Sequence, residues 1–260
     1  MKKVWLTSLE KSEDNVKRIM SALKGYGLDV QGHFWTDELE KMAWIGPRDV
    51  MLDKDLAVWV ILATSEALSS PNIRYGLSLL ALTVQAQRGL NFPIVILQPG
   101  GEAISPGGLT TTLQGADVIA ADNPAFGAKI VANVHAPGKK AAAEYRLDCY
   151  GNPQIGQWFE IGPAGSTWKG ALFGVAGAKI TFQAVGPRGQ LPEKSTLNYP
   201  IQDMQLGLGE TEYIAWAVLN ELGPDTSYFI KVEGYPESIL FGEYSTKEAA
   251  DVFVLSLIHI

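Results

Sequence analysis

The sequence has little of what metal and thiol chemistry require: one cysteine and three histidines among 260 residues. A single cysteine, Cys149, excludes an intrachain disulfide framework, and we expect it to be a small buried side chain rather than a nucleophile. His33, His135 and His259 show no ligand spacing with one another or with this cysteine. The sequence therefore predicts no metal site.

Long apolar runs are also missing. No uncharged run reaches the roughly 18 to 20 residues that a membrane-spanning helix needs, and the apolar start VWL is too short for a signal peptide. With 47% hydrophobic and 19% charged residues, however, the chain is able to bury a sizeable core. We therefore expect a cytoplasmic protein with no membrane partner.

Basic residues are scarce in the second half of the chain. Residues 1–140 carry 14 Lys or Arg and 14 Asp or Glu, whereas residues 141–260 carry 7 and 14. The whole net charge of −7 therefore lies in the second part, and its sign argues against a nucleic-acid partner. This break in charge also predicts a change of domain near residue 140.

Signature motifs of nucleotide-dependent enzymes and hydrolases are absent as well. TSLEKSED stands where a glycine-rich dinucleotide turn would follow the first strand, and GPAGSTWKG lacks the spacing of a phosphate loop. No G-x-S-x-G elbow occurs. We expect no resident cofactor, and leave NAD or another nucleotide open as a ligand.

The first part of the chain does contain a regular alternation of apolar strands and amphipathic helices. Strand candidates are KKVWLTSL, LDVQGHFW, LAVWVILAT, FPIVILQP and ADVIAAD, and helix candidates are SEDNVKRIMSALKGYG, residues 71–88 and PAFGAKIVANV. LAVWVILAT is apolar throughout, as in a central parallel strand buried on both faces. This alternation predicts an α/β domain over residues 1–136, with a parallel five-stranded sheet flanked by helices.

The pattern changes after a predicted linker at residues 137–143. Short strand candidates follow, separated by Gly, Pro and Asn turns: EYRLDCY, QWFEIG, AKITFQAV, EYIAWAVLNEL, SYFIKVEG and SILFGEYS. A capping box, Ser245 with Glu248, predicts a late helix over STKEAADVFVL. We expect residues 144–260 to form a mainly β domain.

The last letters, LSLIHI, resemble a translated sequencing adapter, in which case the native chain continues; the alternative is a native apolar helix end.

Three segments of the first part carry a resemblance to a known family. They are VWLTSL; FWTDELEKMAWIGPRDV, with Gly46 and Pro47 together; and DLAVWVILATSEALSSPNIRYGLSLL, which looks like a strand, a serine-rich turn and a helix. Over about 135 residues the chain resembles the TIR (Toll/interleukin-1 receptor) fold, a flavodoxin-like five-stranded sheet, with Gly46-Pro47 at the place of the family's BB loop. Another flavodoxin-like fold is the alternative.

The resemblance gives a meaning to Gly76. In TIR enzymes that cleave NAD, the helix after the serine-rich turn begins with Trp-Cys-x-x-Glu, and this glutamate is catalytic. Here Asn72, Ile73 and Gly76 take the places of the Trp, Cys and Glu. Cleavage builds positive charge on the ribose, and a nearby carboxylate stabilises this charge. Glycine has no side chain and does not. The resemblance therefore implies a catalytically degenerate domain that works in protein interaction and signalling, with a protein partner or by self-association.

The candidate interaction residues belong to the presumed BB segment: Trp44, Ile45, Gly46 and Pro47. Trp44 and Ile45 form either an exposed apolar knob, which would be a strong anchor at an interface, or a part of the packed core.

The alternative function is an enzyme that cleaves N-ribosyl bonds with a displaced carboxylate, either an NAD glycohydrolase or something like a nucleoside 2-deoxyribosyltransferase. Glu66 is the catalytic candidate, because it follows the LAVWVILAT strand at the edge where open α/β sheets bind ligands. The candidate ligand-binding residues are Ser8, Trp35, Arg48 and Ser65. For Glu66 and for the acids Asp37, Glu38 and Glu40, the competing interpretation is a solvated surface charge.

Overall fold

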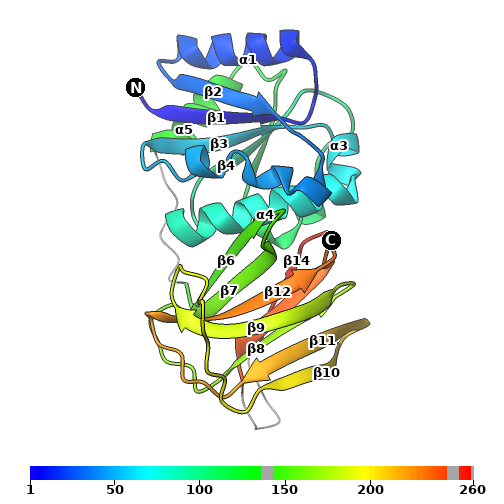
Figure 1. The fold of residues 1–260 in the computed structure, drawn as a ribbon. Helices are drawn as coiled ribbons and strands as arrows, with labels where there is room; N and C mark the ends of the chain where they lie inside the picture. The colour runs from blue at the N-terminus through cyan, green and yellow to red at the C-terminus, as the bar shows by residue number, and fades with distance from the viewer. Residues whose placement is uncertain (136–142, 245–251, 259–260) are drawn as a thin grey trace. The chain divides into compact units, whose positions relative to one another are not determined.

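The computed structural model describes residues 1–135, 143–244 and 252–258, and the chain divides into two compact units near residue 142 (Figure 1). The predicted linker lies almost wholly outside the described residues. The N-terminal unit alternates strands with helices and short 3₁₀ turns: β1 (Lys3–Ser8), α1 (Glu13–Gly25), β2 (Asp29–Phe34), η1 (Leu39–Lys41), η2 (Ala43–Ile45), α2 (Arg48–Met51), β3 (Leu56–Leu62), α3 (Ser65–Ser69), α4 (Pro71–Arg88), β4 (Ile94–Gln98), η3 (Pro106–Gly108), η4 (Thr111–Leu113), β5 (Asp117–Ala120) and α5 (Phe126–His135).

The five strands form one parallel sheet in the order β2-β1-β3-β4-β5. This confirms the predicted parallel sheet flanked by helices. The central strand β3 is buried along nearly its whole length, as its uninterrupted apolar sequence predicts for a strand covered on both faces.

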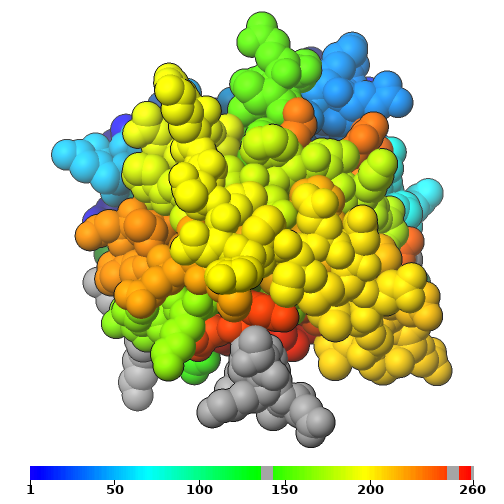
Figure 2. Space-filling model, turned by 60° about the horizontal axis from the view of Figure 1, so that its bottom comes forward, coloured from blue at the N-terminus to red at the C-terminus, as the bar shows by residue number. Residues whose placement is uncertain are grey.

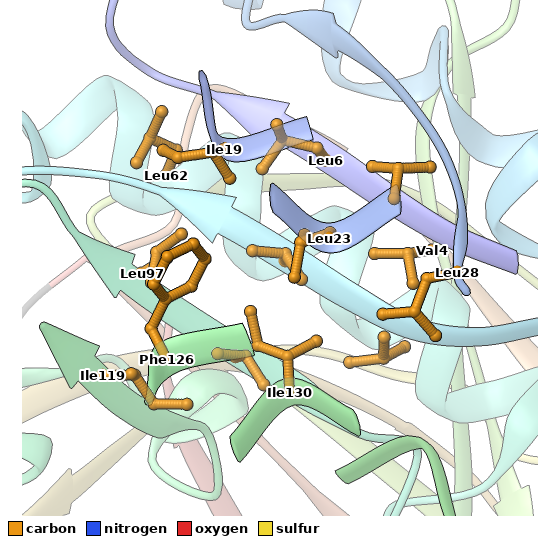
Figure 3. Packing of buried hydrophobic residues seen from close by; sticks show 14 of the residues in the cluster. Val4, Leu6, Ile19, Leu23, Leu28, Leu62, Leu97, Ile119, Phe126 and Ile130 are labelled. Carbon is orange, nitrogen blue, oxygen red and sulfur yellow. The ribbon is translucent and has the colours of Figure 1, made fainter. Parts of the chain in front are cut away.

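Helices α1 and α5 cover one face of this sheet. Ile19 and Leu23 of α1 and Ile130 of α5 pack on the alternate strand residues that point to them, in a cluster that Figure 3 shows from close by. Helix α4 lies on the opposite face of the sheet (Figure 1). Burial of aliphatic side chains on both faces is the main term that stabilises such a layered unit.

The ends of the helices follow the expected rules in part. Ser12 caps α1, because its hydroxyl accepts a hydrogen bond from the amide of Asn15. Pro71 occupies the first turn of α4, where its missing amide costs nothing. A serine just before Pro71 is typical of a helix cap, but the Ser70 side chain makes no capping bond; Thr64 instead caps the short helix α3, which the sequence did not predict.

The C-terminal unit consists of strands: β6 (Tyr145–Asn152), β7 (Gly156–Pro163), β8 (Ala171–Ala176), β9 (Lys179–Pro187), β10 (Ile201–Leu208), β11 (Thr211–Val218), β12 (Thr226–Glu233), β13 (Ser238–Glu243) and β14 (Val252–Ser256). They form two antiparallel sheets, in the orders β6-β7-β12-β9 and β10-β11-β8-β13-β14. The sheets face each other through aromatic rings: Phe159 of β7 lies 5.3 Å from Phe173 of β8, and Tyr145 of β6 lies 4.9 Å from Phe241 of β13. This is a sandwich with an aromatic core.

The late helix is wrong where the structure describes it. Val252–Ser256 is strand β14, which pairs antiparallel with β13, and residues 245–251 of the expected helix lie outside the described residues. Valine and phenylalanine favour a strand, and pairing with an existing sheet edge outweighs the capping signal. Among the described helices, none has both the length and the apolar character that a membrane span requires.

Candidate functional site

A crevice of about 680 Å³ opens at the carboxyl edge of the parallel sheet. Its walls come from the ends of β1 and β2, the start of α1 and the start of α4: Leu9, Lys11, Glu13, Phe34, Trp35, Thr36, Asp37, Glu38 and Ile73. Open α/β sheets bind ligands outside the carboxyl ends of their strands. A larger cavity, of about 930 Å³, lies at the amino-terminal edge of the same sheet, so position rather than volume makes the carboxyl-edge crevice the candidate site.

Backbone hydrogen bonds hold the strand ends that form the crevice. The Trp35 amide donates to the Ser8 carbonyl at 2.8 Å, and the Leu9 amide donates to the Leu62 carbonyl at 2.9 Å. The buried Ser8 hydroxyl donates to the carbonyl of Glu10 at 2.7 Å. The predicted ligand-binding residue Ser8 therefore shapes the turn beneath the crevice and does not line it.

Trp35 explains the glycine in α4. A Cβ atom added at Gly76 would lie 2.7 Å from Cζ2 of the Trp35 indole, closer than real Cβ atoms approach. Trp35 is itself 8% exposed, so the indole has little freedom to move away. The ring thus packs directly on the helix backbone at the position where the family resemblance places a catalytic glutamate, and no side chain fits there.

The Trp35 indole also carries an unused donor. Nε1 of Trp35 is buried and has no hydrogen-bond partner among the described residues. A buried donor without a partner costs about 1–3 kcal/mol. A ligand acceptor that reached Nε1 would recover part of this cost.

Carboxylates line the rim of the crevice. Glu13, Asp37, Glu38 and one lysine, Lys11, line the crevice, and all four are exposed. A hydrogen bond and the charge of Lys17, at 2.8 Å, hold the pKa of Glu13 below its ordinary value, and Glu38 pairs with Lys41 at 3.1 Å. Because Lys11, Lys17 and Lys41 offset the three carboxylates, the charge of the rim does not by itself select an anionic, neutral or cationic ligand.

The other predicted site residues lie away from the crevice wall. Glu66 and Ser65 are the first residues of α3, where Glu66 is exposed to solvent and Ser65 is half-buried. Arg48 is half-buried at the start of α2. Of the predicted catalytic and ligand-binding residues, Trp35 alone lines the crevice, and the placement of Glu66 agrees with a solvated surface charge.

The presumed BB segment is largely folded into the unit. Trp44 is 1% exposed, and its turn η2 packs on α4, so Trp44 is a core side chain and not an exposed knob. Pro47 is also buried, whereas Ile45 is half-buried and Gly46 is exposed. Any interface at this segment must therefore use Ile45 and Gly46.

His33 lies on β2 next to the crevice and predicts a pH dependence of stability. Its Nδ1 accepts a hydrogen bond from Nε1 of Trp5 at 3.0 Å, and burial lowers its pKa below the ordinary value. The unfolded chain then binds the proton more readily, so the free energy of unfolding should fall as the pH drops below about 6.5. Urea unfolding at several pH values would measure this, with His33→Gln as the variant expected to lose the dependence. An equal slope in both proteins would contradict it.

No group of three or more His, Cys, Asp or Glu side chains suited to a metal ion occurs in the part of the chain that the structure describes. No model of a known protein family matches the chain, and no curated protein matches it.

Proposed function

We propose that the N-terminal unit is a TIR-like interaction and signalling module that binds a small ligand in its carboxyl-edge crevice without cleaving it, and that the β unit is an accessory domain. The parallel strand order 2-1-3-4-5 supports a flavodoxin-like plan, to which the TIR fold belongs. In this view the module signals through a protein partner or through self-association.

The packing of Trp35 on Gly76 is the observation that carries the proposal. Cleavage of an N-ribosyl bond needs a carboxylate held close to the sugar. At the helix position that supplies this group in the catalytic family, the space for a side chain is filled by the indole. A ring with a buried N–H offers stacking and one hydrogen bond, which suit binding rather than bond cleavage.

Purified protein is expected to leave NAD and nucleosides intact. The measurement is product formation by chromatography over a long incubation, with a known NAD glycohydrolase as the positive control. Turnover above the enzyme-free blank would contradict a non-catalytic module. Binding is tested separately, by titrating NAD or nucleosides against the wild type and a Trp35→Leu variant.

Turnover would favour the alternative function, an enzyme that cleaves N-ribosyl bonds. In that case the acids that line the crevice are the first candidates for the catalytic carboxylate. Asp37 and Glu38 line the crevice, while Glu66 does not. Asp37→Asn and Glu38→Gln are then the informative variants. A loss of turnover in Glu66→Gln alone would restore the original candidate.

Self-association is expected to depend on concentration and on the exposed part of the BB segment. Ile45→Asp places a charge on a half-buried side chain that borders exposed Gly46, and should weaken an interface formed there. Sedimentation velocity over a range of concentrations measures the association. A protein that stays monomeric at all concentrations up to high micromolar would argue against self-association. The module would then have to signal through a different protein.

A further inference from the structure

The C-terminal unit has a cleft of its own, which is independent of the function proposed for the N-terminal unit. This edge cleft has a volume of about 260 Å³. It is formed by Thr181, Phe182, Gln183 and Ala184 of β9, by Gln202 of β10 and Trp216 of β11, and by Pro192, Glu193, Ser195 and Leu197 between β9 and β10. Since β9 and β10 are the outermost strands of their sheets, the cleft opens at the edge of the sandwich.

The cleft contains a buried amide with an unused donor. Gln183 is 4% exposed, and its Oε1 accepts a hydrogen bond from the hydroxyl of Tyr228 at 2.6 Å. Burial holds the pKa of Tyr228 well above its ordinary value, so that hydroxyl stays a donor and fixes the orientation of the amide. Nε2 of Gln183 is left buried with no partner among the described residues. A ligand oxygen would supply the missing acceptor.

The wall opposite β9 is already formed. The Ser195 hydroxyl accepts a hydrogen bond from the amide of Val185 at 2.7 Å and donates to its carbonyl at 2.9 Å. The Asn220 side chain donates to the carbonyl of Thr196 and accepts from the amide of Asn198. In Figure 2 the yellow part of the chain, which includes residues 192–197, lies on the face turned to the viewer. A cleft fixed in this way loses little entropy when a ligand binds.

The chemistry of the lining selects the ligand. Glu193 is the one ionisable side chain among the described residues that line the cleft, and its negative charge disfavours an anion. Gln183 offers a donor and the Glu193 carboxylate an acceptor, so a ligand must present groups of both kinds. Trp216 adds aromatic surface, because it pairs with Phe173 and so points to the inner face of its sheet, whereas the Phe182 ring packs on Trp158 at the outer face. A pyranose ring meets all three demands, because hydroxyls donate and accept while one face of the ring carries only C–H groups.

We propose that the edge cleft binds a neutral sugar ring, with Nε2 of Gln183 donating to a ring or hydroxyl oxygen and Trp216 packing on its C–H face. The cleft volume of about 260 Å³ leaves room for one hexose ring. The ligand is either a free monosaccharide or the terminal unit of a glycan.

The test titrates the full chain with methyl glycosides of glucose, galactose, mannose and N-acetylglucosamine, and with neutral oligosaccharides ending in the same units. Isothermal titration calorimetry measures affinity. We expect at least one glycoside to bind. Tighter binding of the oligosaccharide assigns a glycan; equal binding assigns a free monosaccharide.

Variants decide whether the edge cleft is the site. Gln183→Met keeps the length of the side chain and removes the donor, and should weaken binding about tenfold or more. Gln154→Met, at an exposed turn of the same unit, is the matched control and should bind as the wild type does. Because Gln183→Met also removes the acceptor of Tyr228, Glu193→Ala serves as the second variant; it removes the acceptor that the cleft offers, and its exposed side chain makes misfolding a lesser concern. Absence of binding for every probe, or unchanged affinity in Gln183→Met or Glu193→Ala, would overturn the proposal.

Discussion

Gly76→Ala is expected to lower the free energy of unfolding by about 1–3 kcal/mol, because it overfills a packed contact. The new methyl group would lie 2.7 Å from Cζ2 of Trp35 and 3.4 Å from Cδ2 of Leu39, both from buried side chains. Alanine is the better helix former by about 1 kcal/mol, so the steric cost must exceed this gain for destabilisation to be seen. Urea unfolding of the full chain measures the sum.

Gly25→Ala is the matched control. Gly25 ends α1, and a Cβ atom there would meet nothing within 4 Å. The same substitution should therefore raise the free energy of unfolding by about 0.4–1 kcal/mol, mainly because alanine lowers the conformational entropy of the unfolded chain. The opposite signs of the two glycine variants would separate packing from helix propensity.

A double-mutant cycle identifies the side chain responsible. Trp35→Leu removes the ring that the new methyl group would strike, so Gly76→Ala should cost much less in that background. If Gly76→Ala stabilises the wild-type protein as Gly25→Ala does, then Trp35 does not occupy the space beside Gly76. The argument for a non-catalytic site would then lose its main support.

Much of the N-terminal fold is predictable because its central strands are short, uninterrupted runs of apolar residues. A strand covered on both faces needs apolar residues throughout, and LAVWVILAT and FPIVILQP have them, with helical spacing between. Strands β8 and β10 were not predicted. ALFGVA is buried throughout and shows no alternation, and Gly174 interrupts its short apolar run; IQDMQLGL of β10 mixes polar residues with Gly207 and has no regular period of two.

The site is less predictable, because its key contacts join distant parts of the chain. Trp35 is one of the predicted ligand-binding residues, and it lines the crevice. The sequence gives no sign that its ring rests on Gly76, since only the crossing of β2 and α4 brings them together. Glu66 misses the crevice because the Thr64 cap turns the chain into α3 directly after β3. Ile73 and Thr36 belong to no motif that marks a binding site, and only the structure shows that they line the crevice.

Arg146→Met is expected to cost the C-terminal unit about 3–5 kcal/mol, the range seen when one partner of a buried ion pair is removed. The guanidinium lies 3.8 Å from the Glu160 carboxylate, and the side chains are 12% and 4% exposed. It also donates to the hydroxyl of Ser227 at 2.8 Å and to backbone carbonyls, including that of Pro163 on β7 at 2.8 Å. One side chain of β6 thereby ties together β7 and β12.

Most of the lost stability would come from buried polar groups that no longer have a donor, rather than from the lost attraction between Arg146 and Glu160. Methionine fills much of the same volume, but the carbonyls of Gly223 and Thr226 would lose their guanidinium donor. Within the described ranges, Glu160 would keep the hydrogen bonds from the Tyr150 hydroxyl and the amide of Gly189 alone. A buried carboxylate with fewer donors and no cation is costly, whereas a neutral amide at the same place is less so.

Glu160→Gln in the Arg146→Met background should therefore recover part of the stability, although it is destabilising alone. Lys169→Met is the control for losing a positive charge, because Lys169 is exposed and should change the free energy of unfolding by less than about 0.5 kcal/mol. Urea unfolding gives the magnitudes, and hydrogen exchange read peptide by peptide shows whether the loss is confined to the C-terminal unit. If Arg146→Met costs no more than Lys169→Met, the guanidinium does not hold the three strands together, and aromatic packing between the sheets must account for their stability.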